Sequence, residues 1–188
     1  MSKEFYERFP TLLGLHTTHE IYPILPGLGD INAEDKRVVY VKKYYSIAEK
    51  VGKLFGINPL FILAQGAIES GWGTSNLSQN HNNFFGITAV GSPNTFWSGT
   101  KYQSTTSKLW FRTYRDAQDG FSDFARLLAS KYSEAAKART IDQYAGIISS
   151  SPYITEKNGD NRAKYRELII KNAEAISIIT KKYQSLYN

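Results

Sequence analysis

Apolar side chains recur at three- and four-residue spacing in several segments of the chain, which is the pattern of amphipathic helices. The first predicted helix follows a capping pair, Asn32 with Asp35, and ends at Gly56. Its apolar positions are Val38, Val41, Tyr45, Ala48, Gly52 and Phe55. We therefore expect this helix to pack one face against the rest of the domain.

A second helix is predicted to start at Asn58, an N-cap followed by proline at the first helical position. Gly71 and Gly73 end it, which places Glu69 in its last turn. Its apolar residues are Leu60, Phe61, Leu63, Ala64, Ala67 and Ile68. Because so few polar positions remain, we expect this helix to be buried.

Three more helices are predicted towards the C-terminus. The first starts with an N-cap pair, Asp116 and Asp119, and the second with a capping box, Thr140 and Gln143. A loop over residues 149–159 leads to the third, which carries a long apolar stripe. The apolar positions of the three helices are Phe121, Phe124, Leu128 and Tyr132, then Ile141, Tyr144 and Ile148, then Tyr165, Leu168, Ile169, Ile176, Ile179 and Tyr183.

Residues 82–114 differ in character, because glycine, proline and asparagine interrupt short apolar runs. This pattern predicts a small antiparallel β lobe of two or three short strands beside the helices. Prolines and glycines in residues 1–31 predict an irregular N-terminal arm. The sequence thus predicts an arm followed by one α+β domain over residues 32–188.

Composition adds a preference for anionic partners. The 188 residues are 41% hydrophobic and 14% aromatic, which suffices for a globular core rich in rings. A formal net charge of +6 favours contact with a polyanion, such as an anionic cell wall. Nucleic acid is not expected, because the chain has no arginine-rich run, zinc-ligand cluster or phosphate-binding glycine loop.

Disulfides, metals and membrane insertion are not expected. The chain has no cysteine, and His16, His19 and His81 lack metal-binding spacing, so no cofactor is implied. No run is apolar enough to cross a membrane, and residues 1–10 lack the apolar core of a secretion signal. We expect a chain trimmed of its signal, or one that leaves the cytoplasm through phage-induced lysis or injection by a contractile secretion apparatus.

Glu69 is the candidate for acid catalysis. A glutamate at a helix end is most often solvated or salt-bridged. Here the negative end of the helix dipole and the apolar surroundings both disfavour the ionised form, which predicts a raised pKa for this carboxyl. An acid that stays protonated near neutral pH can protonate a leaving-group oxygen. The amides and rings of residues 80–86 that follow suit a sugar.

Two blocks around Glu69 resemble a known family. Residues 64–73 read AQGAIESGWG and residues 83–87 read NFFGI, which is similar to the signature of the bacterial glucosaminidase domains, glycoside hydrolase family seventy-three. These domains cut peptidoglycan glycan strands. Residues 111–124 resemble a second block of the family, and the resemblance covers about residues 36–180.

The resemblance implies a lysozyme-like fold with a cleft between a helical lobe and a β lobe. It also implies hydrolysis of the β-1,4 bond between N-acetylglucosamine and N-acetylmuramic acid. A muramidase or lytic transglycosylase is the closest alternative, because a Glu-Ser-Gly sequence at a helix end is also used there. A wall-binding module without activity is another. We expect a monomer that acts at the bacterial cell wall, in the periplasm or outside the cell, with an immunity or inhibitor protein as a further partner.

Residues near Glu69 and in the β lobe are candidates for binding the sugar. The amides of Gln65 and Asn83 are expected to position it, although an asparagine in such a loop more often closes a turn. The candidate stacking rings, whose alternative role is core packing, are Trp72, Phe84, Phe85 and Trp97.

The second catalytic group is open. Glycosidases generally use two carboxylates, but no Asp or Glu lies between Glu69 and Asp116, where the family often carries one near residues 104–106. Residues 153–156 resemble the family's Tyr-Ala-Thr-Asp motif, whose tyrosine lies close to the catalytic acid. Three explanations remain: attack by the substrate's own acetamido group assisted by Tyr153, which we favour, a second carboxylate from Glu156, or inactivity.

Overall fold

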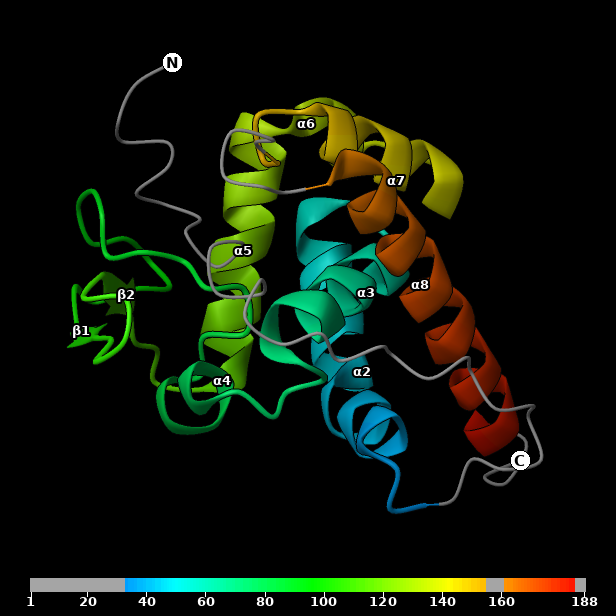
Figure 1. The fold of residues 1–188 in the computed structure, drawn as a ribbon, viewed down its shortest axis with the longest axis horizontal. Coiled ribbons are helices and arrows are strands. Elements are labelled where there is room, and N and C mark those ends of the chain that lie inside the picture. The colour runs from blue at the N-terminus through cyan, green and yellow to red at the C-terminus, as the bar shows by residue number, and fades with distance from the viewer. Residues whose placement is uncertain (1–32, 155–160, 185–188) are drawn as a thin grey trace.

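The structure is a computed structural model that describes residues 33–154 and 161–184, without the side chains of residues 183 and 184. The predicted N-terminal arm and Glu156 lie outside the described residues. Within the described part, the chain forms seven helices and one two-stranded sheet (Figure 1). These are α2 (Lys36–Phe55), α3 (Pro59–Ser70), α4 (Asn76–His81), β1 (Lys101–Gln103), β2 (Trp110–Arg112), α5 (Ala117–Lys131), α6 (Ser133–Ala136), α7 (Ile141–Ser150) and α8 (Arg162–Gln184).

The five helices predicted from apolar spacing are all present. Four of these helices begin at an N-cap residue. The side chain of each N-cap accepts a hydrogen bond from a backbone N–H of the first turn, a group that has no partner within the helix. These caps are Asp35 for α2, Asn58 for α3, Asp116 for α5 and Thr140 for α7. The short helices α4 and α6 were not predicted, because six and four residues are too few to show a helical period.

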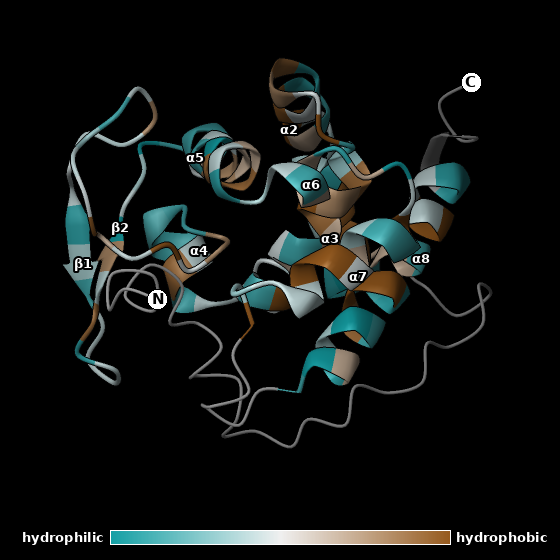
Figure 2. Cartoon of the chain, turned by 90° about the horizontal axis from the view of Figure 1, so that it is seen from above, coloured by the Kyte–Doolittle hydropathy of each residue, from teal (hydrophilic) through white to brown (hydrophobic). Residues whose placement is uncertain are grey.

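Helix α3 forms the centre of the helical lobe. Every residue from Phe61 to Ser70 is buried. Helices α2 and α8 pack against α3, and α7 packs against α8 (Figure 1). In Figure 2 the hydrophobic residues concentrate on α3 and on the parts of its neighbours that lie against it. No helix of the described residues combines the length and the hydropathy that a bilayer-spanning segment requires.

Gly66 allows the close packing on α3. A Cβ atom at this position would lie 2.5 Å from the Tyr40 hydroxyl oxygen and 3.1 Å from the Phe85 ring. Real Cβ atoms essentially never come within 3.0 Å of another atom, so a side chain here would displace the Tyr40 hydroxyl and press on the Phe85 ring.

The β lobe is smaller than its sequence span suggests. Strands β1 and β2 pair antiparallel, with Lys101 opposite Arg112 and Gln103 opposite Trp110. A single bridge from Thr88 to Phe111 extends the pairing. The prediction of an α+β fold with a helical lobe and a small antiparallel β lobe is confirmed.

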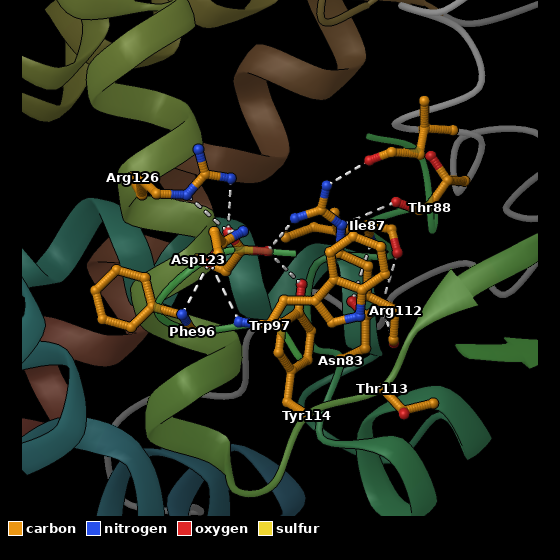
Figure 3. Close-up of polar contacts among 12 residues, drawn as sticks. Asn83, Ile87, Thr88, Phe96, Trp97, Arg112, Thr113, Tyr114, Asp123 and Arg126 are labelled. Atoms are coloured by element: carbon orange, nitrogen blue, oxygen red, sulfur yellow. Dashed lines mark hydrogen bonds and ion pairs between the residues drawn. The ribbon is translucent and has the colours of Figure 1, made fainter. Parts of the chain in front are cut away.

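A buried ion-pair cluster joins the β lobe to α5, which stands between that lobe and α2 (Figures 1 and 3). The Asp123 carboxylate accepts hydrogen bonds from Arg112 at 2.5 Å, from Arg126 at 2.7 Å and from the Tyr114 hydroxyl at 2.9 Å. Arg112 also donates to the carbonyl oxygens of Thr88 and Val90. Both charged groups of the central pair are at most 3% exposed, so each depends on the other for compensation.

Replacing Asp123 by asparagine should therefore destabilise the fold strongly. We expect Asp123→Asn to lower the free energy of unfolding by about 3–5 kcal/mol, because the buried Arg112 guanidinium loses its counter-charge. Urea unfolding measures this change. Asp142→Asn is the matched control, because it breaks an exposed 3.2 Å pair with Arg166 and should cost less than about 1 kcal/mol. Equal losses of stability in the two variants would contradict the conclusion that Asp123 is the buried counter-charge of Arg112.

Candidate active site

A left-handed turn ends α3 directly after Glu69 and Ser70. Three successive residues have positive φ, namely Gly71 at 59°, Trp72 at 64° and Gly73 at 73°. The Trp72 N–H donates to the Ala67 carbonyl at 2.8 Å, and the Gly73 N–H donates to Ser70 Oγ at 2.7 Å. These bonds satisfy groups that a helix end leaves without partners, so the last turn of α3 and its glutamate are held in place.

Two tyrosines from distant parts of the chain donate hydrogen bonds to one oxygen of Glu69. The Tyr165 hydroxyl lies 2.8 Å from Glu69 Oε1, and the Tyr153 hydroxyl lies 3.3 Å from the same atom. Tyr165 belongs to the first turn of α8, and Tyr153 to the turn that follows α7. Glu69 is 9% exposed, so these phenols replace much of the water that would otherwise solvate its carboxyl.

Gln65 lies one turn before Glu69 on the same face of α3. Its residue is fully buried, and its Oε1 accepts a hydrogen bond from the Tyr144 hydroxyl of α7. The Tyr144 ring stacks on Phe61 with a centroid distance of 4.7 Å. Gln65 is thus part of the buried layer beneath Glu69, and its expected direct contact with a sugar is not supported by this position.

The turn that carries Tyr153 is braced from α8. Arg162 donates to the Ser150 carbonyl at 2.9 Å and to the Ile154 carbonyl at 3.2 Å. Ser151 Oγ accepts a hydrogen bond from the Tyr153 N–H at 3.1 Å. These bonds fix the backbone on both sides of Tyr153 and aim its hydroxyl at Glu69.

The phenols around Glu69 remain protonated. Burial raises the pKa of Tyr153 and of Tyr165 well above the ordinary value of 10.0, and the negative charge of Glu69 raises both further. Burial first and Glu69 second also raise the pKa of Tyr144. These tyrosines therefore act as neutral hydrogen-bond donors and not as bases near neutral pH.

The rings that were expected to stack on a sugar are buried. Phe84 and Phe85 are 1% and 0% exposed. Phe85 stacks on Phe124 at 3.9 Å, and Phe84 packs edge-on against Tyr44 at 4.6 Å. Trp72 is 5% exposed and packs on Tyr40. Their positions correspond to the alternative role, core packing.

Asn83 and Trp97 also have structural contacts. The Asn83 amide nitrogen donates to the carbonyls of Ile87 and Arg112, both at 2.9 Å, and its oxygen accepts from the Ile87 N–H at 3.0 Å. The Trp97 indole N–H donates to Thr100, and the Arg112 guanidinium lies 4.1 Å from its ring centroid. Asn83 closes a turn and Trp97 packs inside the β lobe, so neither offers its polar or stacking groups to a ligand.

The structure brings Glu69, Tyr153 and Gln65 together, and it adds two residues that were predicted only as members of apolar helix faces. Tyr144 and Tyr165 sit at core positions of their helices, but each hydroxyl points to a polar group of α3. A tyrosine in an apolar stripe gives no sign of where its hydroxyl lies, so neither contact could be found from spacing.

Glu69 and Asp123 are the buried acidic side chains of the described residues. Asp123 forms ion pairs with the guanidinium groups of Arg112 and Arg126. The contacts described for Glu69 are neutral phenols, which support both the charged and the protonated carboxyl. Glu69 stays the candidate acid predicted from the sequence.

The family of this chain follows from comparison with known proteins. The sequence model of the glucosaminidase family, described as mannosyl-glycoprotein endo-beta-N-acetylglucosaminidase, matches residues 45–177. The chain therefore belongs to the glucosaminidase family, and the resemblance and the prediction of a glycoside hydrolase are confirmed.

The curated relatives are longer proteins. The peptidoglycan hydrolase FlgJ of Vibrio parahaemolyticus is 34% identical over 102 residues, which are 47% of this chain and 32% of that protein. A putative endo-beta-N-acetylglucosaminidase of Streptococcus pneumoniae is 29% identical over 116 residues, 60% of this chain and 16% of that protein. This chain thus spans about a third or less of the length of these relatives.

Solved structures agree with the fold. The glycoside hydrolase domain of Salmonella typhimurium FlgJ superposes with a TM-score of 0.63 at 25% identity, covering 80% of this chain and 94% of that one. A chain of a type VI secretion effector–immunity complex from Pseudomonas protegens gives 0.57 at 18% identity, with 77% and 96% covered. The lysozyme-like fold predicted from the sequence is confirmed by this likeness.

The raised pKa of Tyr144 predicts a pH-dependent stability. A phenol whose pKa is higher in the folded than in the unfolded state contributes stability that is complete below about pH 10 and is lost as the pH rises further. The Tyr144→Phe variant has no phenol at this position and does not show this loss. Above about pH 10, the free energy of unfolding of the wild type should therefore fall relative to that of the variant, by up to about 1.4 kcal/mol per pH unit. Urea unfolding of both proteins over this range measures the difference. If the free energies of unfolding of the two proteins changed in parallel with pH, Tyr144 would ionise as easily in the folded state as in the unfolded state.

Proposed function

We propose that this chain hydrolyses the β-1,4 bond between N-acetylglucosamine and N-acetylmuramic acid in peptidoglycan, with Glu69 as the general acid. The observation that carries the proposal is the buried Glu69 carboxyl at the end of α3, held by the phenols of Tyr153 and Tyr165. Membership of the glucosaminidase family and relatives named peptidoglycan hydrolases support the same substrate.

Glu69 would act on the leaving group. Cleavage of a glycosidic bond requires a proton on the departing oxygen, and a carboxyl in a poorly solvated site is a suitable donor. The two phenols stabilise the carboxylate that forms after proton transfer, because each directs an O–H dipole at Oε1. The protein therefore supplies a proton and disperses the charge left behind.

We further propose that the substrate's acetamido group is the nucleophile. The other buried acid of the described residues, Asp123, is neutralised by Arg112 and Arg126 and is not available as a base. In this route the acetamido oxygen attacks the anomeric carbon as Glu69 protonates the leaving oxygen, and water then opens the cyclic intermediate. Tyr153 would orient the acetamido group, since its 3.3 Å contact with Glu69 is long and easily exchanged.

The proposed place of action is the bacterial cell wall, in the periplasm or outside the cell. The net charge of +6 supports association with an anionic wall. An immunity or inhibitor partner stays a prediction, because the likeness to a chain of the Pseudomonas protegens effector–immunity complex supports the fold alone at 18% identity.

Digestion of purified cell walls tests the activity. The protein should release fragments whose reducing end is N-acetylglucosamine, identified by mass spectrometry. A reducing or anhydro muramic end would indicate a muramidase or a lytic transglycosylase, and binding to walls without release of fragments would indicate a binding module.

Glu69→Gln should keep the fold and abolish this release, because the amide preserves shape but cannot donate the acid proton. Glu174→Gln, an exposed glutamate of α8, is the matched control and should retain full activity. A loss smaller than about tenfold in Glu69→Gln, or about 1.4 kcal/mol of barrier, would reject Glu69 as the acid.

Substitutions of Tyr153 and Glu156 distinguish the candidates for the second catalytic group. If the acetamido group is the nucleophile, Tyr153→Phe should reduce kcat by about 10²-fold or more, because it removes an oriented hydrogen bond to a group that develops charge. Glu156→Gln should then change the rate little. The product should retain its anomeric configuration, since two successive attacks invert the centre twice, and proton NMR at early times reports this. An inverted product, or equal inactivation by Glu156→Gln and Glu69→Gln, would restore a two-carboxylate mechanism.

A further inference from the structure

We propose that Trp110, on the small sheet of the β lobe, stacks on a sugar ring of the peptidoglycan strand, and that Lys101 beside it contacts carboxylates of the same polymer. The inference rests on the proposed function, because it names a second place at which that substrate is held. It concerns binding of the strand and gives Trp110 no part in breaking the bond.

Trp110 exposes its ring, unlike the four rings that were predicted to stack on a sugar. Its residue is 45% exposed, and it is the aromatic member of the large exposed hydrophobic residues in the described part of the chain. Trp72 and Trp97, the other two tryptophans of the chain, are 5% and 3% exposed. A single exposed apolar residue is ordinary on a protein surface, so the neighbours of Trp110 decide what its ring can bind.

Strand β2, which carries Trp110, is hydrogen-bonded along both edges. On one edge it pairs with β1, where Gln103 lies opposite Trp110. On the other edge the Trp110 carbonyl accepts from the Ala89 N–H, and the Arg112 N–H donates to the Ile87 carbonyl, both at 2.9 Å. The backbone beneath the ring is therefore already ordered, which lowers the entropy cost of binding a ligand on it.

The segment that forms the β lobe carries only positive charges. Residues 70–115 contain no Asp or Glu, and their basic residues are Lys101, Lys108, Arg112 and Arg115. The two arginines pair with acidic groups at or within α5. The two lysines are exposed, and both lie close in sequence to Trp110 or on the strand paired with it. This surface therefore complements an anionic polymer.

Lys101 places a charge directly beside the exposed ring. Its Nζ lies over the Trp110 ring, 4.9 Å from the centroid, which is within the range of a cation–π contact. Peptidoglycan combines flat sugar rings with carboxylates, because its muramic acid residues carry peptides through their lactyl groups. A sugar that stacks on Trp110 would thus bring its anionic substituents towards Lys101.

Binding of peptidoglycan strands to the Glu69→Gln variant tests the inference without hydrolysis. The probe is soluble strands with intact peptides and no teichoic acid, so that phosphate contributes nothing. These strands should protect tryptophan fluorescence from quenching by acrylamide, because Trp110 is the exposed tryptophan of the chain. Absence of protection would overturn the inference, and this measurement needs no substitution in the β lobe.

Trp110→Ala on the Glu69→Gln background measures the contribution of the ring. Calorimetry should show a Kd for the strands raised about tenfold, because the variant loses the stacking surface. Leu54→Ala is the matched control, because Leu54 of α2 is also exposed, at 64%, and should bind the strands as its parent does. An unchanged Kd in Trp110→Ala, or an equal loss in Leu54→Ala, would reject Trp110 as the stacking ring.

Lys101→Gln measures the contribution of the charge. At low salt it should raise the Kd for native strands about threefold, and it should not change the Kd for strands whose carboxyl groups have been amidated. Lys50→Gln, which removes an exposed charge from α2, should change neither value. Equal effects of the two lysine substitutions would show that only net charge matters and would overturn the role of Lys101.

Kinetics separate this inference from the proposed function. A site that binds the strand equally in the ground state and the transition state lowers KM alone, so Trp110→Ala in the active protein should raise KM and leave kcat nearly unchanged. If walls are hydrolysed but Trp110→Ala binds strands as tightly as its parent, the inference fails and the proposed function stands. If strands bind through Trp110 but no fragments are released, the proposed function fails and the binding site remains.

Discussion

The hydrogen bonding of one poorly solvated carboxyl group determines much of this structure. Glu69 lies at the end of a helix whose residues from Phe61 onward are all buried, so water cannot provide its full complement of donors. The protein compensates with phenols that α8 and the turn after α7 bring to Oε1. The packing of α8 on α3, and the bonds from Arg162 to the turn after α7, are the means by which these donors are held.

The two buried acidic side chains of the described residues, Glu69 and Asp123, carry the same carboxyl group but have different partners. Asp123 receives guanidinium groups from Arg112 and Arg126, and it serves to attach the β lobe to α5. The described partners of Glu69 are neutral hydroxyls, which accept either charge state of the carboxyl. The two cationic partners of Asp123 thus make it part of a structural joint between the β lobe and α5.

Sequence patterns predicted the helices well, because capping residues such as Asn58 and Asp116 act locally and the apolar period spans several turns. The resemblance to the family's Tyr-Ala-Thr-Asp motif indicated that Tyr153 lies near Glu69, and its hydroxyl is 3.3 Å from the Glu69 carboxyl. The patterns did not separate rings that pack in the core from rings that face a ligand, so both roles stayed open for Phe84 and Phe85, which the structure buries. Burial is decided by tertiary contacts with residues such as Phe121 and Phe124, which are distant in sequence.

The contact from Tyr165 to Glu69 spans 96 residues, and that from Tyr153 spans 84. A ribosome synthesises the acid long before it synthesises either donor, and contacts so distant in sequence form late, because a large loop must first close. The Tyr165 bond therefore requires α8 to have packed on α3, and the Tyr153 bond requires the turn after α7 to have formed. The surroundings of Glu69 are thus completed by the part of the chain that is synthesised after the β lobe and α5.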